Sequence, residues 1–263
     1  MKKLILPLLV LMACKPPASA DFSHGTWIDL SYTYDDQTIY WPTDTQGFVK
    51  DTVSEGMTEK GYYYSAYDFC SAEHGGTHLD APVHFAEGKH SVEQIPVDQL
   101  VGTAIVIDVS EKALKDRDYQ VSQEDFIAWE AHNEMIPDGV ILLIRTGYGQ
   151  YWPDRKQYLG TDKMGPEAIP ELHFPGLHPD GATWLSTERN IKAVGLDTPS
   201  IDYGQSTMFE SHQILFKNNI PAFENVANLD QLHKVGSWVF ALPMKIGGGS
   251  GAPVRIIGWV PHI

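Results

Sequence analysis

The sequence predicts one domain of the α/β class, in which strands and helices are mixed along the chain. Short apolar runs rich in β-branched residues alternate with helix-like segments from about residue 25 to the end. No repeat or linker interrupts the alternation, and 263 residues fall within the range of one compact domain. Apolar residues make up 43% of the chain and include seven tryptophans, which is enough to build a core.

Eight short apolar segments have the composition of β-strands, and several are bounded by Gly or Pro. The predicted strands are 26–31, 62–73, 103–109, 140–146, 192–196, 220–223, 238–242 and 254–260.

Three segments predict the main helices. Ser122 is followed three residues later by Asp125, which is typical of a capping box, and the apolar periodicity then continues to His132. The segments 180–189 and 210–218 predict the other two, and His212 lies in the last of them on the side that can face inward.

Residues 1–20 predict an export signal. Two lysines precede an apolar run that is too short to span a bilayer. Two cleavage positions stay open: before Cys14, in a segment that resembles a lipoprotein box and would make Cys14 a lipid anchor, or after Ala20, in a small-residue pattern. Either cut predicts a periplasmic or secreted protein, which the first would anchor to a membrane through Cys14, and in both cases residues 21–263 form a single domain.

Charge and cysteine content exclude two classes of protein. A net charge of −15 repels phosphate groups, so nucleic acid is excluded as a partner. Only Cys70 lies beyond the signal, so the mature domain is not a disulfide scaffold. We expect Cys70 to be a small buried residue, because it lacks the electropositive neighbours of a nucleophile.

The most informative segment, 74–84, reads HGGTHLDAPVH and contains His74, His78, Asp80 and His84. Its glycines and proline disfavour a helix and favour a loop that leads into a strand. Along an extended chain His78, Asp80 and His84 would share a face, and the glycines would bring His74 round to it. Imidazole and carboxylate together suit a divalent ion such as zinc or manganese.

A single histidine is usually a structural residue with a satisfied hydrogen bond, and most histidines of this chain are interpreted in that way. These are His24, His90, His132, His173, His178, His233 and His262. The cluster in 74–84 differs, because so many polar groups packed together need a partner that holds their charges.

The segment 74–84 resembles the signature of the cyclase family that contains bacterial kynurenine formamidase and isatin hydrolase. The resemblance continues through GLDTPSID at 195–202, through His212 and Glu224, and through GSGAPVR at 249–255. It implies a swivelling β/β/α domain with a mixed sheet and flanking helices. It also implies a homodimer or a higher even oligomer.

The resemblance assigns roles to the clustered residues. It implies His74, His78 and Asp80 as metal ligands and His84 as the catalytic acid and base. A second metal ion, held by the shared aspartate with a later His and Glu, would involve His212 and Glu224. From the residues alone, these last two are common structural residues on a helix and a strand, and whether they bind an ion or handle protons stays open.

Aromatic residues that precede the signature line the substrate pocket in that family. The resemblance implies such a role for Trp41, Phe48, Tyr63 and Phe69, with Trp41 the strongest of them. Each one, taken singly, is also an ordinary core or strand residue.

The predicted function is hydrolysis of a cyclic or formylated aryl amide by a metal-activated water. A divalent ion lowers the pKa of water from about 15.7 toward roughly 7. His84 would take the proton and return it to the departing nitrogen, and Thr77 could support the oxyanion. Isatin is favoured over N-formylkynurenine, the arylformamidase substrate, because the latter is made and consumed inside cells.

Two other functions use the same residues. A true cyclase would apply the same carbonyl activation to ring closure, and a periplasmic lipoprotein could bind the metal without catalysis. His84 discriminates against the lipoprotein, because a metal carrier gains little from an unligated imidazole beside an open coordination position.

Overall fold

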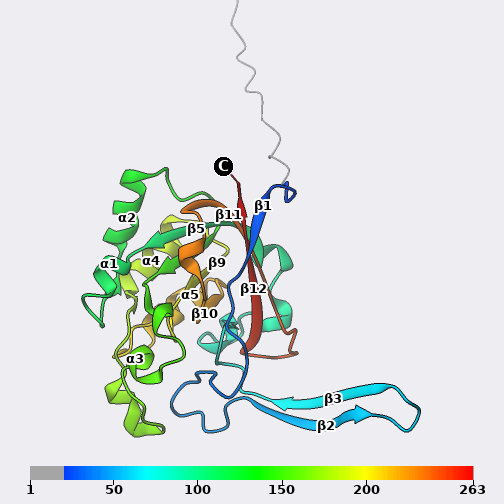
Figure 1. Cartoon of the computed structure of the whole chain (residues 1–263). Helices are drawn as coiled ribbons and strands as arrows, with labels where there is room; N and C mark the ends of the chain where they lie inside the picture. Colours follow the sequence, from blue (N-terminus) through cyan, green and yellow to red (C-terminus); the bar gives the residue numbers. More distant parts are fainter. Residues whose placement is uncertain (1–20, 263) are drawn as a thin grey trace, which may run out of the picture.

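The computed structural model describes residues 21–262, which form a mixed α/β body around one large sheet (Figure 1). The export signal and the Cys14 anchor lie outside these residues and stay predictions. The strands of the large sheet are β1 (Gly25–Asp29), β4 (His78–Asp80), β5 (Val101–Asp108), β7 (Ile141–Arg145), β9 (Ala193–Leu196), β10 (Ala222–Glu224), β11 (Val235–Pro243) and β12 (Gly251–Pro261).

The large sheet closes on itself. Its strand order is β1-β12-β11-β5-β7-β9-β10-β4, and β12 pairs in addition with β4. One edge of β12 pairs with β4 over 251–253 and with β1 over 257–261. The predicted mixed sheet is therefore present, but it forms a barrel, which the sequence analysis did not anticipate because closure depends on strand pairing between distant segments.

The two faces of the barrel strands carry two separate cores. In β5, Ala104 and Val106 point into the barrel, where they meet Leu143 and Val239. The alternate residue Ile105 points outward into the layer below the helices. Where β5, β7 and β9 run parallel and are covered on both faces, at 104–107, 141–144 and 193–196, their sequences are continuous apolar runs.

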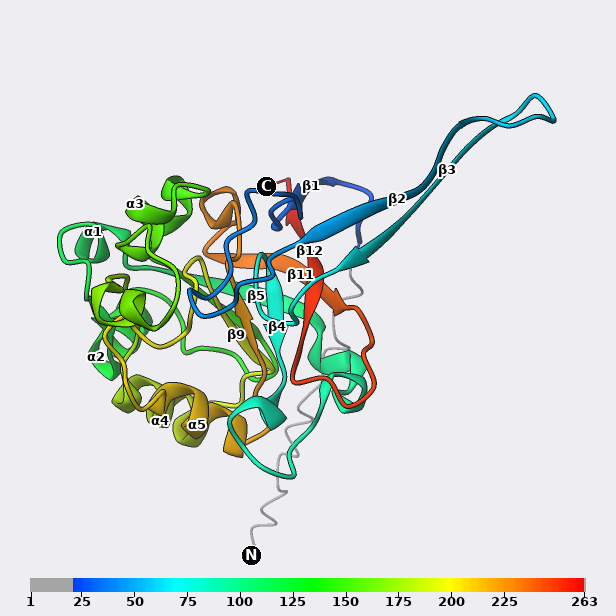
Figure 2. The ribbon, with the colours of Figure 1, turned by 90° about the horizontal axis from the view of Figure 1, so that it is seen from below.

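Three helices cover the outer face of these strands: α2 (Gln123–His132), α4 (Pro179–Glu188) and α5 (Glu210–Lys217) (Figure 2). Their bounds agree with the predicted ones to within one residue. The capping box of α2 is confirmed, since the Ser122 backbone N–H donates to Asp125 Oδ2 at 2.9 Å. The sequence analysis missed α1 (Ser110–Ala113) and α3 (Arg155–Leu159), which are too short to show helical periodicity.

A two-stranded hairpin of β2 (Val49–Met57) and β3 (Tyr63–Cys70) projects far from the body (Figure 2). Only its second strand was predicted, because β2 is polar and lacks apolar alternation. The expectation for Cys70 is wrong: it is exposed at the end of β3, since neither face of this hairpin is covered by the rest of the described chain.

Short elements complete the chain. The strands β6 (Gln120–Val121) and β8 (Gly176–Leu177) pair in parallel ahead of α2 and α4. Short 3₁₀ helices are Pro82–His84, Val92–Gln94, Val97–Gln99, Tyr148–Tyr151, Pro166–Glu171 and Leu229–Gln231. Between residues 21 and 262, every helix is too short or too polar to cross a membrane.

The close approach of β8 to the loop before α5 yields a stability prediction. A Cβ atom on Gly176 would lie 2.2 Å from the backbone nitrogen of Tyr203, and backbone cannot move aside as a side chain can. Gly176→Ala should therefore lower the free energy of unfolding in urea by about 1–3 kcal/mol or more. Gly247→Ala is the control, because no atom lies within 4 Å of its added Cβ. Equal stability of the two variants would contradict the packing described.

Candidate active site

The site is built on β4, which lies between β10 and the beginning of β12. Leu79 points into the barrel core, so His78 and Asp80 on either side of it point to the opposite face. Glu224 on β10 is the register partner of His78, and residues directly opposite each other in an antiparallel pair share a face. Three predicted ligands are therefore held side by side on regular strands.

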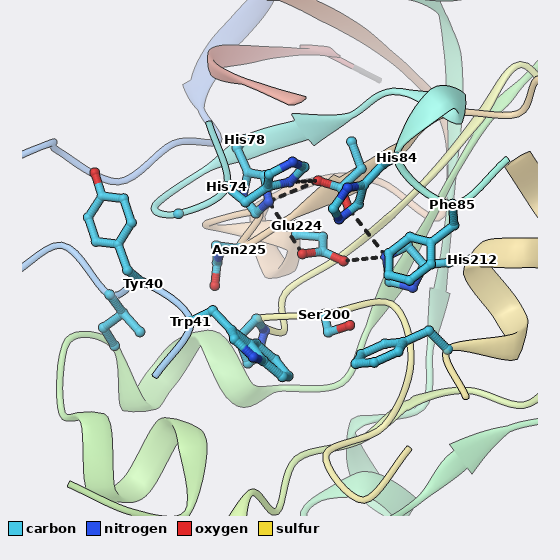
Figure 3. A pocket seen from close by; sticks show the side chains of 15 residues that line it. Tyr40, Trp41, His74, His78, His84, Phe85, Ser200, His212, Glu224 and Asn225 are labelled. Carbon is cyan, nitrogen blue, oxygen red and sulfur yellow. Dashed lines mark hydrogen bonds and ion pairs between the residues drawn. The ribbon is translucent and has the colours of Figure 1, made fainter. Parts of the chain in front are cut away.

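A helix and a loop complete the cluster (Figure 3). His212, on α5, places its Nε2 atom 3.2 Å from Asp80 Oδ2 and 3.2 Å from Glu224 Oε1. His74 comes from the loop before β4, and its Nδ1 atom lies 2.7 Å from Asp80 Oδ1. All five residues implied as metal ligands by the sequence thus meet in one place, although His212 and Glu224 lie more than 130 residues after β4.

The five side chains form two groups that could hold a metal ion: His74, His78 and Asp80, and then Asp80, His212 and Glu224. Within each group, one ligand atom per residue lies within 4.8 Å of the others. Asp80 belongs to both groups. Its Oδ1 atom faces His74 and lies 3.0 Å from His78 Nε2, whereas its Oδ2 atom faces His212.

Hydrogen bonds on the far side of the rings orient two of the histidines. His78 Nδ1 lies 3.0 Å from the carbonyl oxygen of Gly76, and His212 Nδ1 lies 2.6 Å from Asp202 Oδ2. Each ring donates its Nδ1–H to that acceptor, so Nε2 is the nitrogen directed at the carboxylates. Metal-binding histidines in proteins are oriented by such second hydrogen bonds.

The charges of the cluster fit a cation. Burial alone would raise the pKa of Asp80, but attraction by His74 and His78 holds it well below its usual range. Burial and the charge of Asp80 raise the pKa of Glu224. Burial likewise opposes the effect at His78, whose pKa is nevertheless raised to about 9 by Asp80 and Glu224. In the described part of the chain, histidines are the only basic residues that pair with these carboxylates, so a divalent ion would supply the missing positive charge.

His84 reaches the site in a way that differs from the sequence prediction. The chain does not stay extended after Asp80 but turns into the 3₁₀ helix Pro82–His84, so His84 does not share the strand face. Its ring instead stacks on His74, with 3.9 Å between ring centroids. Desolvation lowers the pKa of His84 and Asp80 opposes this, while the imidazoles of His74 and His212 lower it further. A neutral imidazole that can accept a proton therefore lies beside the cluster.

A cavity of about 280 Å³ opens next to the ligands (Figure 3). Trp41, Phe85 and Phe209 form its aromatic wall, with ring centroids 6.2 Å apart for Trp41 and Phe209 and 5.3 Å apart for Phe85 and Phe209. The remaining lining residues are Ile39, Tyr40, His74, Gly75, His78, Asp80, His84, Pro199, Ser200, His212, Glu224 and Asn225.

Of the predicted substrate contacts, only Trp41 lines this cavity. Tyr63 and Phe69 lie on the projecting hairpin with 59% and 56% of their surfaces exposed, and the Phe48 ring stacks on Phe69. These three residues are separated from the cavity because the chain leaves the body at the hairpin before it returns to the signature. The sequence analysis missed Phe85 and Phe209. Phe85 directly follows His84, whereas no sequence signal marks Phe209.

Thr77 does not fulfil the predicted oxyanion role. Its side chain is fully buried, and its hydroxyl donates to the carbonyl oxygen of Asn225 at 2.7 Å and accepts from the Tyr32 backbone N–H at 2.9 Å. Both functions of the hydroxyl are thus used within the fold. Asn225 itself lines the cavity, and its Nδ2 donates to the Gly76 carbonyl oxygen at 2.7 Å.

Comparisons with known proteins agree with this fold. The family model described as Cyclase matches residues 28–203. The chain is 31% identical to isatin hydrolase of Roseibium aggregatum over 197 residues, and this alignment covers 72% of each of the two chains. It is 30% identical to kynurenine formamidase of Bacillus cereus over 231 residues, and this alignment covers 88% of this chain and 96% of the relative.

Solved structures show the same architecture. Isatin hydrolase A from Labrenzia aggregata, bound to benzyl benzoate, matches with a TM-score of 0.81 at 28% identity, over 90% of this chain and 94% of the other. Given the family match, the relatives named isatin hydrolase and kynurenine formamidase, and this shared fold, the chain belongs to the cyclase family.

Proposed function

We propose that this protein is a metal-dependent hydrolase that opens a cyclic or formylated aryl amide. The observation that carries the proposal is the position of His84. Its imidazole belongs to neither ligand group, stacks on the ligand His74 and opens onto the aromatic cavity. A side chain in that position can exchange protons with a substrate whose ring lies against Trp41 and Phe209.

The ligand set suits zinc or manganese. When bound, such an ion polarises the amide carbonyl and lowers the pKa of water. His84 accepts a proton from the attacking water as the carbon–oxygen bond forms, and it returns that proton to the amide nitrogen as the carbon–nitrogen bond breaks. The aromatic wall holds the substrate ring and keeps bulk water from the reacting carbonyl.

We favour isatin as the substrate over N-formylkynurenine. The predicted export signal supports this choice, because formylkynurenine is made and consumed inside cells, whereas isatin is a small neutral compound that can reach an exported enzyme. The likeness to solved isatin hydrolases points the same way. Arylformamidase activity is the second candidate, supported by kynurenine formamidases that this chain matches over 96% of their length.

A metal carrier without catalysis would use the same ligands. It would have no need, however, of an apolar cavity beside the metal site or of an unligated imidazole that opens onto it. Both features favour the hydrolase.

The family resemblance implies a homodimer or a higher even oligomer, and we also propose that two copies of the chain associate through the projecting hairpin. The register of β2 and β3 places Met57, Tyr63, Tyr67 and Phe69 on one face, here called the aromatic hairpin face. These side chains are between 40% and 69% exposed. An isolated two-stranded hairpin is only marginally stable in water, so a second copy that covers this face would stabilise it.

The metal site is tested by removing ligands. His78→Ala should lose one ion, and Asp80→Ala should lose all bound metal because Asp80 belongs to both ligand groups. Elemental analysis after dialysis measures the occupancy, with His132→Ala on the exposed side of α2 as the control. Full occupancy in both ligand variants would rule the site out.

The role of His84 is tested by His84→Ala, which should keep the metal and lower turnover by roughly 10²- to 10⁴-fold, the usual contribution of a positioned acid or base. Metal content and steady-state kinetics are measured on the same preparation. Loss of metal would make His84 a ligand, and unchanged turnover would remove it from the mechanism.

The substrate is tested by comparing isatin, N-formylkynurenine and a simple lactone at matched concentrations, with zinc and with manganese. We expect isatin to be opened fastest, because its flat bicyclic ring matches the aromatic wall. Faster cleavage of formylkynurenine would reverse the order, and no turnover of the three would support the metal carrier.

The association is tested by Phe69→Lys, which places a charge on the aromatic hairpin face and should raise the dimer dissociation constant more than about tenfold. Light scattering over a dilution series gives the mass. Asp68→Lys is the matched control, because the neighbouring side chain points to the opposite face of β3. A monomeric wild-type protein, or equal weakening by both variants, would contradict the proposal.

A further inference from the structure

One ligand, His74, lacks the support that its partners have from secondary structure. His78 and Asp80 are fixed by β4, Glu224 by β10 and His212 by α5. His74 lies in the loop before β4, and its side chain is 25% exposed, compared with 2–5% for the other four. Something else must therefore hold its ring if Nδ1 is to stay 2.7 Å from Asp80.

The loop before β12 supplies that support. Ser250 Oγ lies 2.9 Å from His74 Nε2, and the same hydroxyl donates to Glu73 Oε2 at 2.7 Å. The Ser250 backbone N–H also donates to Glu73 Oε2, at 2.9 Å, so the carboxylate locks the serine in place. The ring itself lies flat against Gly251, where a Cβ atom would be 2.5 Å from His74 Cε1.

The direction of the hydrogen bonds determines which nitrogen of His74 is free. An ionised carboxylate can only accept, so the single hydroxyl proton of Ser250 goes to Glu73. Ser250 Oγ then has only lone pairs to offer, and His74 must donate its Nε2–H to one of them. The atom left to bind a metal ion is Nδ1, which is the nitrogen that faces Asp80.

We propose that Ser250 and Glu73 are positioning residues that set the tautomer and ring orientation of His74 and thereby the affinity of the first metal site. This inference rests on the proposed metal-dependent function. It assigns a role to the glycine-rich segment 249–251, whose small residues let the loop approach the ring closely. It also differs from the arrangement at His78 and His212, where the oriented ligand atom is Nε2.

The experiment measures metal affinity with a chromophoric chelator, for zinc and for manganese, on the full mature chain. Ser250→Ala should weaken binding about 10- to 100-fold, as expected for loss of an outer hydrogen bond to a metal ligand. Glu73→Gln should weaken it less, because an amide oxygen still accepts from the serine. Ser250→Thr, which keeps the hydroxyl, should retain the wild-type affinity.

Glu93→Gln is the matched control. Glu93 also anchors this loop, by accepting from the Gly248 backbone N–H at 2.9 Å, but it does not touch His74. We expect its metal affinity to be unchanged. Equal weakening by Glu73→Gln and Glu93→Gln would show that the loop is merely held in place, and full affinity of Ser250→Ala would also overturn the proposal.

Nitrogen-15 spectra of histidine-labelled protein test the tautomer directly. The His74 signal, identified by its shift in Ser250→Ala, should show a proton on Nε2 both with and without zinc, and zinc should bind at Nδ1. An unprotonated Nε2 would disprove the chain of hydrogen bonds from His74 through Ser250 to Glu73, even if the metal binds. Conversely, a wild-type chain that binds neither ion would refute the proposed function. The spectrum of the metal-free protein would still show whether His74 donates its Nε2–H to Ser250.

Discussion

The placement of β4 between β10 and β12 is the constraint on which the rest of the structure depends. Leu79 occupies the barrel core, and the alternation of a strand then directs His78 and Asp80 to the opposite face. A shift of one residue in this pairing would bury two polar side chains among apolar ones and expose Leu79. Closure of the barrel and assembly of the ligand cluster are therefore one structural event.

The charge of the cluster follows from its burial. Asp80 and Glu224 lie in the interior next to each other, a costly arrangement unless positive charge lies between them. The surrounding imidazoles are turned so that one nitrogen faces the carboxylates while the other is hydrogen-bonded to a carbonyl, a carboxylate or a serine hydroxyl. These hydrogen bonds fix the ring orientations through groups of the protein itself, which would reduce the entropy lost when an ion binds.

The site separates two tasks in space. In the proposed reaction, the ligand cluster and His84 would provide activation and proton transfer, which a cyclic and an open-chain amide require equally. Trp41, Phe85 and Phe209 shape the cavity that the substrate ring would enter. Under this proposal, selectivity between such substrates would depend on the aromatic wall, whose residues come from three separate segments of the chain.

The sequence by itself determined the α/β class, eight strands, three main helices and the cluster of His74, His78, Asp80 and His84, because periodicity and the dense signature at 74–84 are local signals. His212 and Glu224 could be named only through the family resemblance, since a lone histidine or glutamate carries no local signal. Tertiary structure decided four other features: barrel closure, the turn that carries His84, the exposed hairpin with Tyr63 and Phe69, and the place of Phe209 in the cavity. Each depends on which distant segments pair or pack together, and pairing between distant segments leaves no pattern in the local sequence.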